Sequence, residues 1–149
     1  MPTSLQGPVS LLGRFLLSTI FVMSALGNKI PNFKQVAGFM EQAGIPFPSI
    51  ALAGAIVFLI VGGASVILGY KARIGAALLL VFLALATFYF HNFWAVTDAK
   101  AQQEQMIQAM KNLSMMGAML FIIANGSGAW SLDNYLARGH AGRFGLAAA

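Results

Sequence analysis

Apolar residues fill four long windows along this chain of 149 residues, and polar residues gather between them. The windows run from about 9 to 26, 50 to 68, 74 to 90 and 106 to 124. A bilayer core about 30 Å thick is crossed by roughly 17 to 25 apolar residues in a helix. The pattern therefore predicts an all-α fold, a four-helix transmembrane bundle, as a single domain over residues 1–149.

The segments between the windows predict how the spans are connected. In PNFKQVAGFMEQAG, the apolar residues Phe33, Val36, Ala37 and Met40 recur at helical spacing, which predicts a short amphipathic helix lying in the membrane interface. The prolines of IPFPS then favour a stiff bend. Only GYKAR separates the second and third windows, so a tight turn should join two antiparallel neighbours. Residues 127–149 remain as a C-terminal tail, and its last letters, GLAAA, should be mobile.

Composition supports a membrane location. The chain is 58% hydrophobic and 9% charged, whereas soluble domains average about 25% charged residues. The first window also resembles the apolar core of a signal peptide followed by small residues. No lysine or arginine precedes Arg14, however, so we expect this segment to remain as the first helix.

The nine lysines and arginines give a weak orientation. Placing both termini in the cytoplasm puts the majority of them on that side, as the positive-inside rule requires. The cytoplasmic set would be Arg14, Lys71, Arg73, Arg138 and Arg143, and the outer set Lys29, Lys34, Lys100 and Lys111. Because the net charge of +5 is spread over both sides, it fits membrane anchoring and does not indicate nucleic acid as a partner.

The cysteine and histidine content argues against two kinds of chemistry, thiol-based redox chemistry and metal binding. The chain has no cysteine, so it cannot form or exchange a disulfide, and any redox role must use a bound cofactor or a partner. Its histidines, His91 and His140, fall at opposite ends of the predicted topology without a carboxylate cluster. We therefore expect no metal site.

Polar side chains within the fourth window are costly in a membrane and point to a site. Lys111 and Asn112 lie about five residues inside this window, roughly 8 Å below its start. Glu104 and Gln108 precede Lys111 on nearly the same helix face, which gives a polar stripe descending from the outer surface. The predicted topology brings Lys29, at the end of the first window, to the same depth.

The letters FYFHNFW at the end of the third window add an imidazole, an amide and aromatic rings at this depth. Such a set would suit a flat, hydrogen-bonding, lipid-soluble headgroup such as a quinone. We therefore predict a quinone-type cofactor site. Its members are His91, Asn92, Trp94, Lys111 and Asn112, with Lys29, Glu104 and Gln108 at the rim.

Each of these groups also has a simpler interpretation. Trp94 and its aromatic neighbours are typical of an interfacial belt. His91 suits a hydrogen-bonded helix cap, and Lys111 with Glu104 suits an internal ion pair that fixes helix packing. Near the opposite membrane surface, Arg14 should lean toward Asp133, and there we expect a structural ion pair.

Several segments together resemble the DoxX family. They are GRFLLSTIFVMSALGNKI, VGGASVILGYKARIGA, FHNFW, QMIQAMKNLSMMGAMLF and GSGAWSLD, in the family's order and spacing from Gly13 to Asp133. The resemblance implies a bacterial, four-helix, inner-membrane protein. Some relatives are linked to oxidoreductase assemblies, including thiosulfate:quinone oxidoreductase subunits, and distant relatives act as assembly factors or cargo receptors. The matching polar positions, none with an assigned catalytic role, are Arg14, Asn28, Lys29, His91, Asn92, Trp94, Lys111, Asn112 and Asp133.

One position departs from the family pattern. Leu59 stands where family members often carry a glutamate, three residues before paired glycines, and an intramembrane carboxylate would be a natural proton handler. Two hypotheses follow. The chain is either a quinone-interacting or membrane-anchoring subunit of an oxidoreductase complex, or a non-catalytic accessory or assembly subunit packing against a larger membrane complex. In both cases its partners would be the lipid bilayer and another membrane protein or a second copy of the chain.

Overall fold

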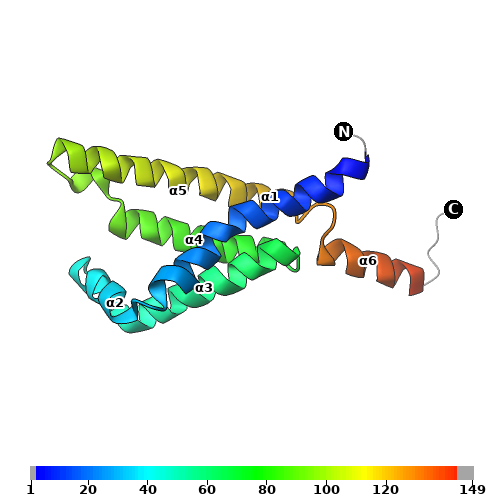
Figure 1. The fold of residues 1–149 in the computed structure, drawn as a ribbon, viewed down its shortest axis with the longest axis horizontal. Helices are drawn as coiled ribbons and strands as arrows, with labels where there is room; N and C mark the ends of the chain where they lie inside the picture. The colour runs from blue at the N-terminus through cyan, green and yellow to red at the C-terminus, as the bar shows by residue number, and fades with distance from the viewer. Residues whose placement is uncertain (1–2, 144–149) are drawn as a thin grey trace.

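The computed structural model describes residues 3–143, and this part of the chain forms helices and no strand. Four helical spans are long and apolar enough to cross a membrane, which confirms the all-α, four-helix prediction. The long helices are α1 (Thr3–Ser24), α3 (Pro48–Leu68), α4 (Ala72–Phe90) and α5 (Ala99–Asn125). α1 begins and the last helix, α6 (Leu132–Arg143), ends at the same end of the molecule (Figure 1).

The helices extend beyond the apolar windows. α1 continues into a five-residue π-helix, Ala25–Lys29. α5 begins well before residue 106, because the Asp98 side chain accepts a hydrogen bond of 2.8 Å from the Ala101 amide and caps the helix. α6 forms within the segment that we expected to be a tail. The expectation of a mobile GLAAA end falls outside the described residues.

The connections follow the sequence pattern. A short helix, α2 (Phe33–Gln42), buries Ala37 and Met40 against Leu52 of α3, as its apolar spacing predicts. Its place in the membrane interface stays a prediction. The turn between α3 and α4 is tight, and it uses left-handed backbone at Gly69 (φ 64°) and Lys71 (φ 48°).

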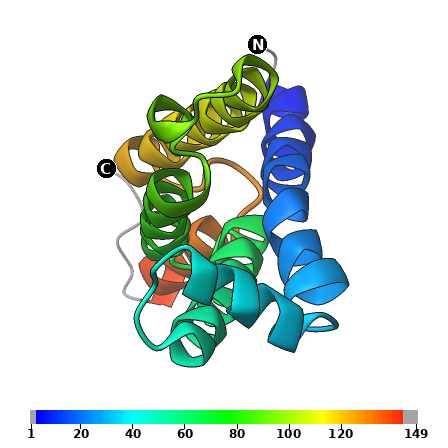
Figure 2. The ribbon, with the colours of Figure 1, turned by 90° about the vertical axis from the view of Figure 1, so that its left-hand side faces the viewer.

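The long helices pack as a row. α1 packs on α3, α3 on α4, and α4 on α5, while α2 covers the first part of α3. Figures 1 and 2 show that α1 and α5 diverge toward the end of the molecule that carries α2. This divergence leaves room for side chains of six helical segments to surround one space.

The core lies where α1, α3, α4 and α5 meet. Phe21, Leu59, Leu79 and Met119 are among its buried side chains. Leu59 is fully buried there, so this position makes apolar contacts in this chain. α3 and α4 come very close, since a Cβ added at Gly62 would lie 2.9 Å from the Gly75 carbonyl oxygen.

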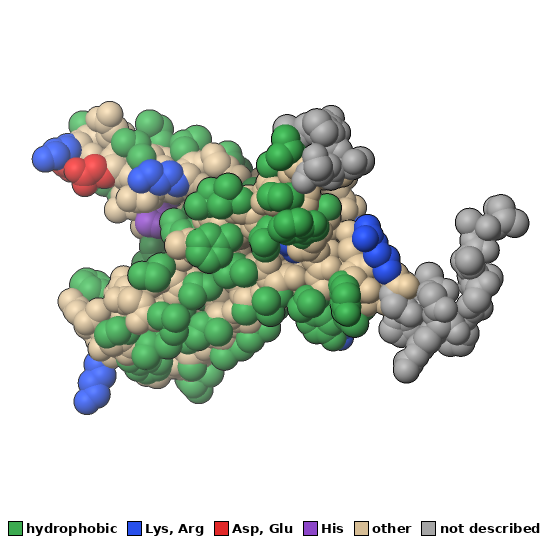
Figure 3. All heavy atoms as spheres, turned by 45° about the vertical axis from the view of Figure 1, so that its right-hand side comes forward, with side chains coloured by type: hydrophobic (Ala, Val, Ile, Leu, Met, Phe, Trp, Pro, Cys, Tyr) green, Lys and Arg blue, Asp and Glu red, His purple; other side chains and the backbone are tan. Residues whose placement is uncertain are grey.

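Hydrophobic side chains also cover the outside of the molecule. In the space-filling view they occupy most of the middle of the face, while most lysine and arginine side chains lie toward the two ends (Figure 3). An apolar band between charged ends is what a lipid bilayer requires of a spanning protein.

Candidate functional site

A cavity of about 530 Å³ lies among α1, the π-helix, α2, α3, α4 and α5. Its walls are apolar apart from five polar side chains. These are Ser24, Asn28, Lys29, His91 and Asn112. Such a volume is in the usual range for a site that holds a small organic molecule, as is the combination of apolar walls and a few polar groups.

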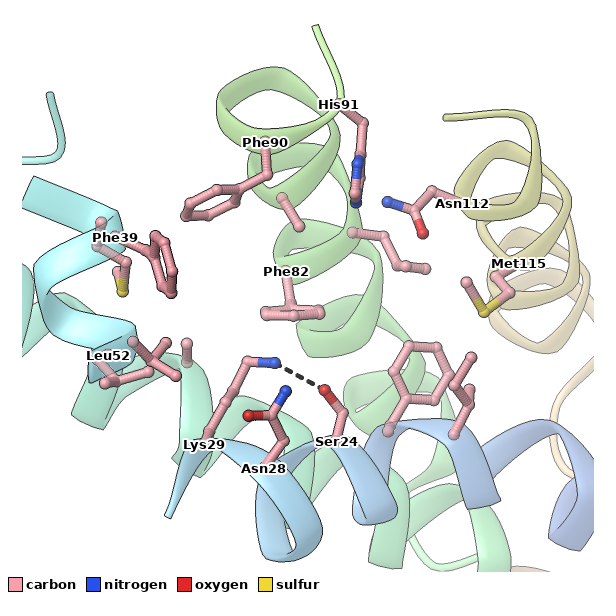
Figure 4. Close-up of a pocket in the computed structure, with 17 residues that line it drawn as sticks. Ser24, Asn28, Lys29, Phe39, Leu52, Phe82, Phe90, His91, Asn112 and Met115 are labelled. Carbon is pink, nitrogen blue, oxygen red and sulfur yellow. Dashed lines mark hydrogen bonds between the residues drawn. The ribbon is translucent and has the colours of Figure 1, made fainter. Parts of the chain in front are cut away.

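Lys29 supplies the only positive charge among the residues that line this cavity. The π-helix has one turn of five residues, which stacks Lys29 beside Ser24. The Lys29 Nζ atom donates a hydrogen bond of 2.6 Å to the Ser24 Oγ atom and lies 5.5 Å from the centre of the Phe82 ring. Because an ammonium group has three N–H donors, Ser24 leaves two of them for another acceptor. Figure 4 shows Lys29 reaching into the cavity beneath Phe82.

His91 reaches the cavity from the end of α4. It is the C-cap of that helix, and its ring Nδ1 atom lies 2.9 Å from the Gln105 Oε1 atom of α5. A carboxamide oxygen only accepts, so Nδ1 carries the proton in this arrangement. The Nε2 atom of this tautomer is an acceptor, which suits a hydroxyl group as its partner.

Asn112 enters from α5 and points toward His91 (Figure 4). It is 9% exposed, and its Nδ2 atom donates a hydrogen bond of 2.9 Å to the Thr87 Oγ1 atom of α4. The Thr87 hydroxyl itself donates to the Leu83 carbonyl oxygen at 2.8 Å. This chain of bonds fixes Asn112 in place, which a ligand-binding amide requires.

The structure brings together only part of the predicted site. Lys29, His91 and Asn112 line the cavity, whereas Asn92, Trp94 and Lys111 lie outside its lining, as do the predicted rim residues Glu104 and Gln108. Trp94 is 58% exposed in a short 3₁₀ turn, where its ring makes an edge contact with Phe93. Lys111, Glu104 and Gln108 are exposed on the outer face of α5.

The rotation of α5 about its axis explains this difference. The face that meets α4 carries Gln105, Ala109, Asn112 and Met119. The predicted stripe lies one residue earlier along the chain, which is about 100° around a helix of 3.6 residues per turn. The small or apolar Ala109 and Met119 could have identified the inward face. The hydropathy pattern did not indicate the polar residues Gln105, Thr87 and Ser24 as part of the site.

Arg14 and Asp133 lie in one cluster without forming the expected ion pair. The buried Arg14 guanidinium donates from Nη2 to the Trp130 carbonyl oxygen. Asp133 instead accepts from the backbone amide of Lys71 at 2.9 Å and caps α4. Within the described part of the chain, no ion pair joins the two side chains, because each is directed at unpaired backbone groups of a turn.

Comparisons with known proteins agree with this architecture. A family model described as DoxX matches residues 9–92. The chain is 32% identical to inner membrane protein YphA of Escherichia coli over 124 residues, which cover 83% of this chain and 86% of that protein. It is 29% identical to inner membrane protein YqjF of the same organism, with 85% and 90% covered.

A more distant similarity reaches eukaryotic proteins. The Surfeit locus protein 4 homolog of Schizosaccharomyces pombe is 31% identical over 71 residues, which cover 47% of this chain and 24% of that protein. No solved structure shows significant similarity. With four apolar helices and two inner-membrane relatives, the chain is a multi-pass inner-membrane protein. Because the family model matches more than half of its length, the chain belongs to the DoxX family.

Proposed function

We propose that the chain binds a quinone-type headgroup in the central cavity, as the membrane subunit of an oxidoreductase complex. The observation that carries this proposal is the position of Lys29. Its ammonium group reaches into an apolar cavity, where it has a hydroxyl and an aromatic ring as neighbours and no carboxylate among the lining residues. A carbonyl oxygen of a ligand would give this cation a further acceptor.

The remaining polar groups suit the other side of such a ring. His91 and Asn112 face the cavity from α4 and α5, opposite Lys29 on the π-helix (Figure 4). At this end Asn112 keeps a second amide N–H for a ring oxygen, and the His91 Nε2 atom would accept from the hydroxyl group of the reduced ring. Phe39, Phe82 and Phe90 line the space between these groups, and aromatic rings stack on flat ligands.

A partner would supply the electrons. The chain contains no cysteine, so it offers no thiol for electron transfer, and its role would be to bind and orient the quinone.

We also propose that the end carrying α6 faces the cytoplasm, which places the cavity in the outer half of the membrane. A single cysteine placed at Lys100 should then react with an impermeant maleimide added outside spheroplasts.

A binding measurement tests the quinone proposal. The purified protein in lipid nanodiscs is titrated with a dimethoxy-methyl-benzoquinone bearing a ten-carbon chain, with empty nanodiscs as the blank. We expect saturable binding, and Lys29→Met should weaken it roughly 10- to 150-fold, since a hydrogen bond to a charged group contributes about 1.5–3 kcal/mol. Lys111→Met is the matched control, because that lysine is exposed and lies outside the cavity lining.

Two results would contradict the proposal. Absence of saturable binding would exclude a quinone site, and equal losses in the two lysine variants would remove the role of Lys29. A protein that co-purifies with a stable membrane partner but binds no quinone would instead be an accessory or assembly subunit.

A further inference from the structure

A second cavity of about 260 Å³ adjoins the central one between α2, α3 and α4. The two share part of their walls, namely Met40, Ala55, Phe82, Ala86 and Phe90. Phe82 forms part of the wall of both cavities. Its ring contacts the Lys29 ammonium group on the polar side and also lines the second cavity.

The second cavity differs in chemistry from the first. All of its lining side chains are apolar, apart from the hydroxyl group of Tyr89. Water needs two to four polar partners in a cavity, so this space is unsuited to ordered water. A hydrocarbon chain could fill this cavity without leaving any polar group of its own unpaired.

The second cavity also runs in the direction that a lipid chain would take. It begins near Ile45, before α3, and extends along that helix past Gly54 to Phe58. These last two residues lie six and ten positions beyond Pro48, or about 9 and 15 Å along the helix axis. The space therefore runs along the helix axis beside the central cavity, in the direction of the middle of the membrane.

We propose that the ligand of the central cavity carries a long apolar chain, and that this chain occupies the second cavity between α2, α3 and α4. The inference rests on the proposed quinone-type site and adds a subsite to it. The headgroup would lie beside the polar Lys29, and the apolar chain would lie beside Gly54 and Phe58. An isoprenoid or alkyl substituent on the ring has this chemistry.

Gly54 allows the subsite to be blocked with little disturbance. A Cβ added there would meet no atom within 4 Å, so a larger side chain can enter the second cavity without striking the backbone. Gly54→Leu and, from the opposite wall, Leu85→Trp are titrated with the ten-carbon benzoquinone and with the same ring lacking the chain. Gly117→Leu is the control, because Gly117 also has open space around it and lines neither cavity.

We expect Gly54→Leu to weaken binding of the chain-bearing ring at least tenfold and binding of the short ring less than twofold. Leu85→Trp should act in the same direction, and Gly117→Leu should change neither affinity. If the short ring binds but both blocking variants leave the chain-bearing ring unaffected, the subsite is refuted while the headgroup site stands. If neither ring binds the unaltered protein, the proposed function fails together with this inference.

Discussion

The turn between α3 and α4 should tolerate no side chain at Gly69. This residue has a φ of 64°, in the left-handed region that favours glycine. A Cβ built on it would overlap the Arg14 guanidinium group and would lie 2.5 Å from the Ser131 Cβ atom. Gly69→Ala must therefore strain the backbone and displace a buried charged side chain.

The expected loss has two parts. A left-handed conformation costs a non-glycine residue roughly 1–2 kcal/mol. Displacing Arg14 also breaks its hydrogen bond to the Trp130 carbonyl oxygen, and bonds to charged groups contribute about 1.5–3 kcal/mol. Gly69→Ala should thus lower the free energy of unfolding by about 2.5–5 kcal/mol.

Gly44→Ala separates the two parts. Gly44 has a φ of 76°, but an added Cβ there would meet no atom within 4 Å, so only the backbone cost of roughly 1–2 kcal/mol applies. The measurement is reversible unfolding in mixed detergent and SDS micelles, followed by tryptophan fluorescence. If Gly69→Ala were no more destabilising than Gly44→Ala, the contact with Arg14 would contribute nothing. In an Arg14→Ala background, Gly69→Ala should cost less than in the unaltered protein, because the backbone part and the contact with the Ser131 Cβ atom remain while the loss of the Arg14 hydrogen bond does not.

Three further changes probe other contacts. Gly75→Ala should lower the free energy of unfolding by about 1–3 kcal/mol through overpacking against α3, whereas Gly117→Ala should not destabilise the protein in the same unfolding assay. Asp133→Ala should cost about 0.5–2 kcal/mol by uncapping α4, and full stability of this variant would refute the cap. Gln105→Ala should change the ¹⁵N shifts of the His91 ring from those of the Nδ1–H tautomer to those of a mixture, and unchanged shifts would show that Gln105 does not fix the tautomer.

Local pattern was sufficient for the spans and their connections. The four windows, the inward face of α2 and the turn at Gly69 all follow from short-range features: hydropathy over one bilayer thickness, helical spacing and backbone preferences. Helix ends were less accurate. The start of α5 depends on the Asp98 cap, which hydropathy does not register, and α6 is a polar helix without a strong periodic signal.

The sequence also predicts the depth of the candidate site, but it predicts only some of the residues that line it. His91, Asn112 and Lys29 were expected near one level of the membrane, and all three line the central cavity. Lys111 was expected with them, yet it lies on the exposed side of α5. The residues that hold the site in place, Gln105 and Ser24, were not identified at all.

The sequence by itself determined a protein with four membrane-spanning helices and predicted the depth of its polar groups, because both depend on how many apolar residues lie along each helix. The tertiary structure decided which lysine faces the cavity. Lipid and protein core are both apolar, so hydropathy does not fix the rotation of a spanning helix about its own axis. Here packing of α5 on α4 directs Asn112 inward and Lys111 outward, and the π-helix after α1 brings Lys29 beside Ser24.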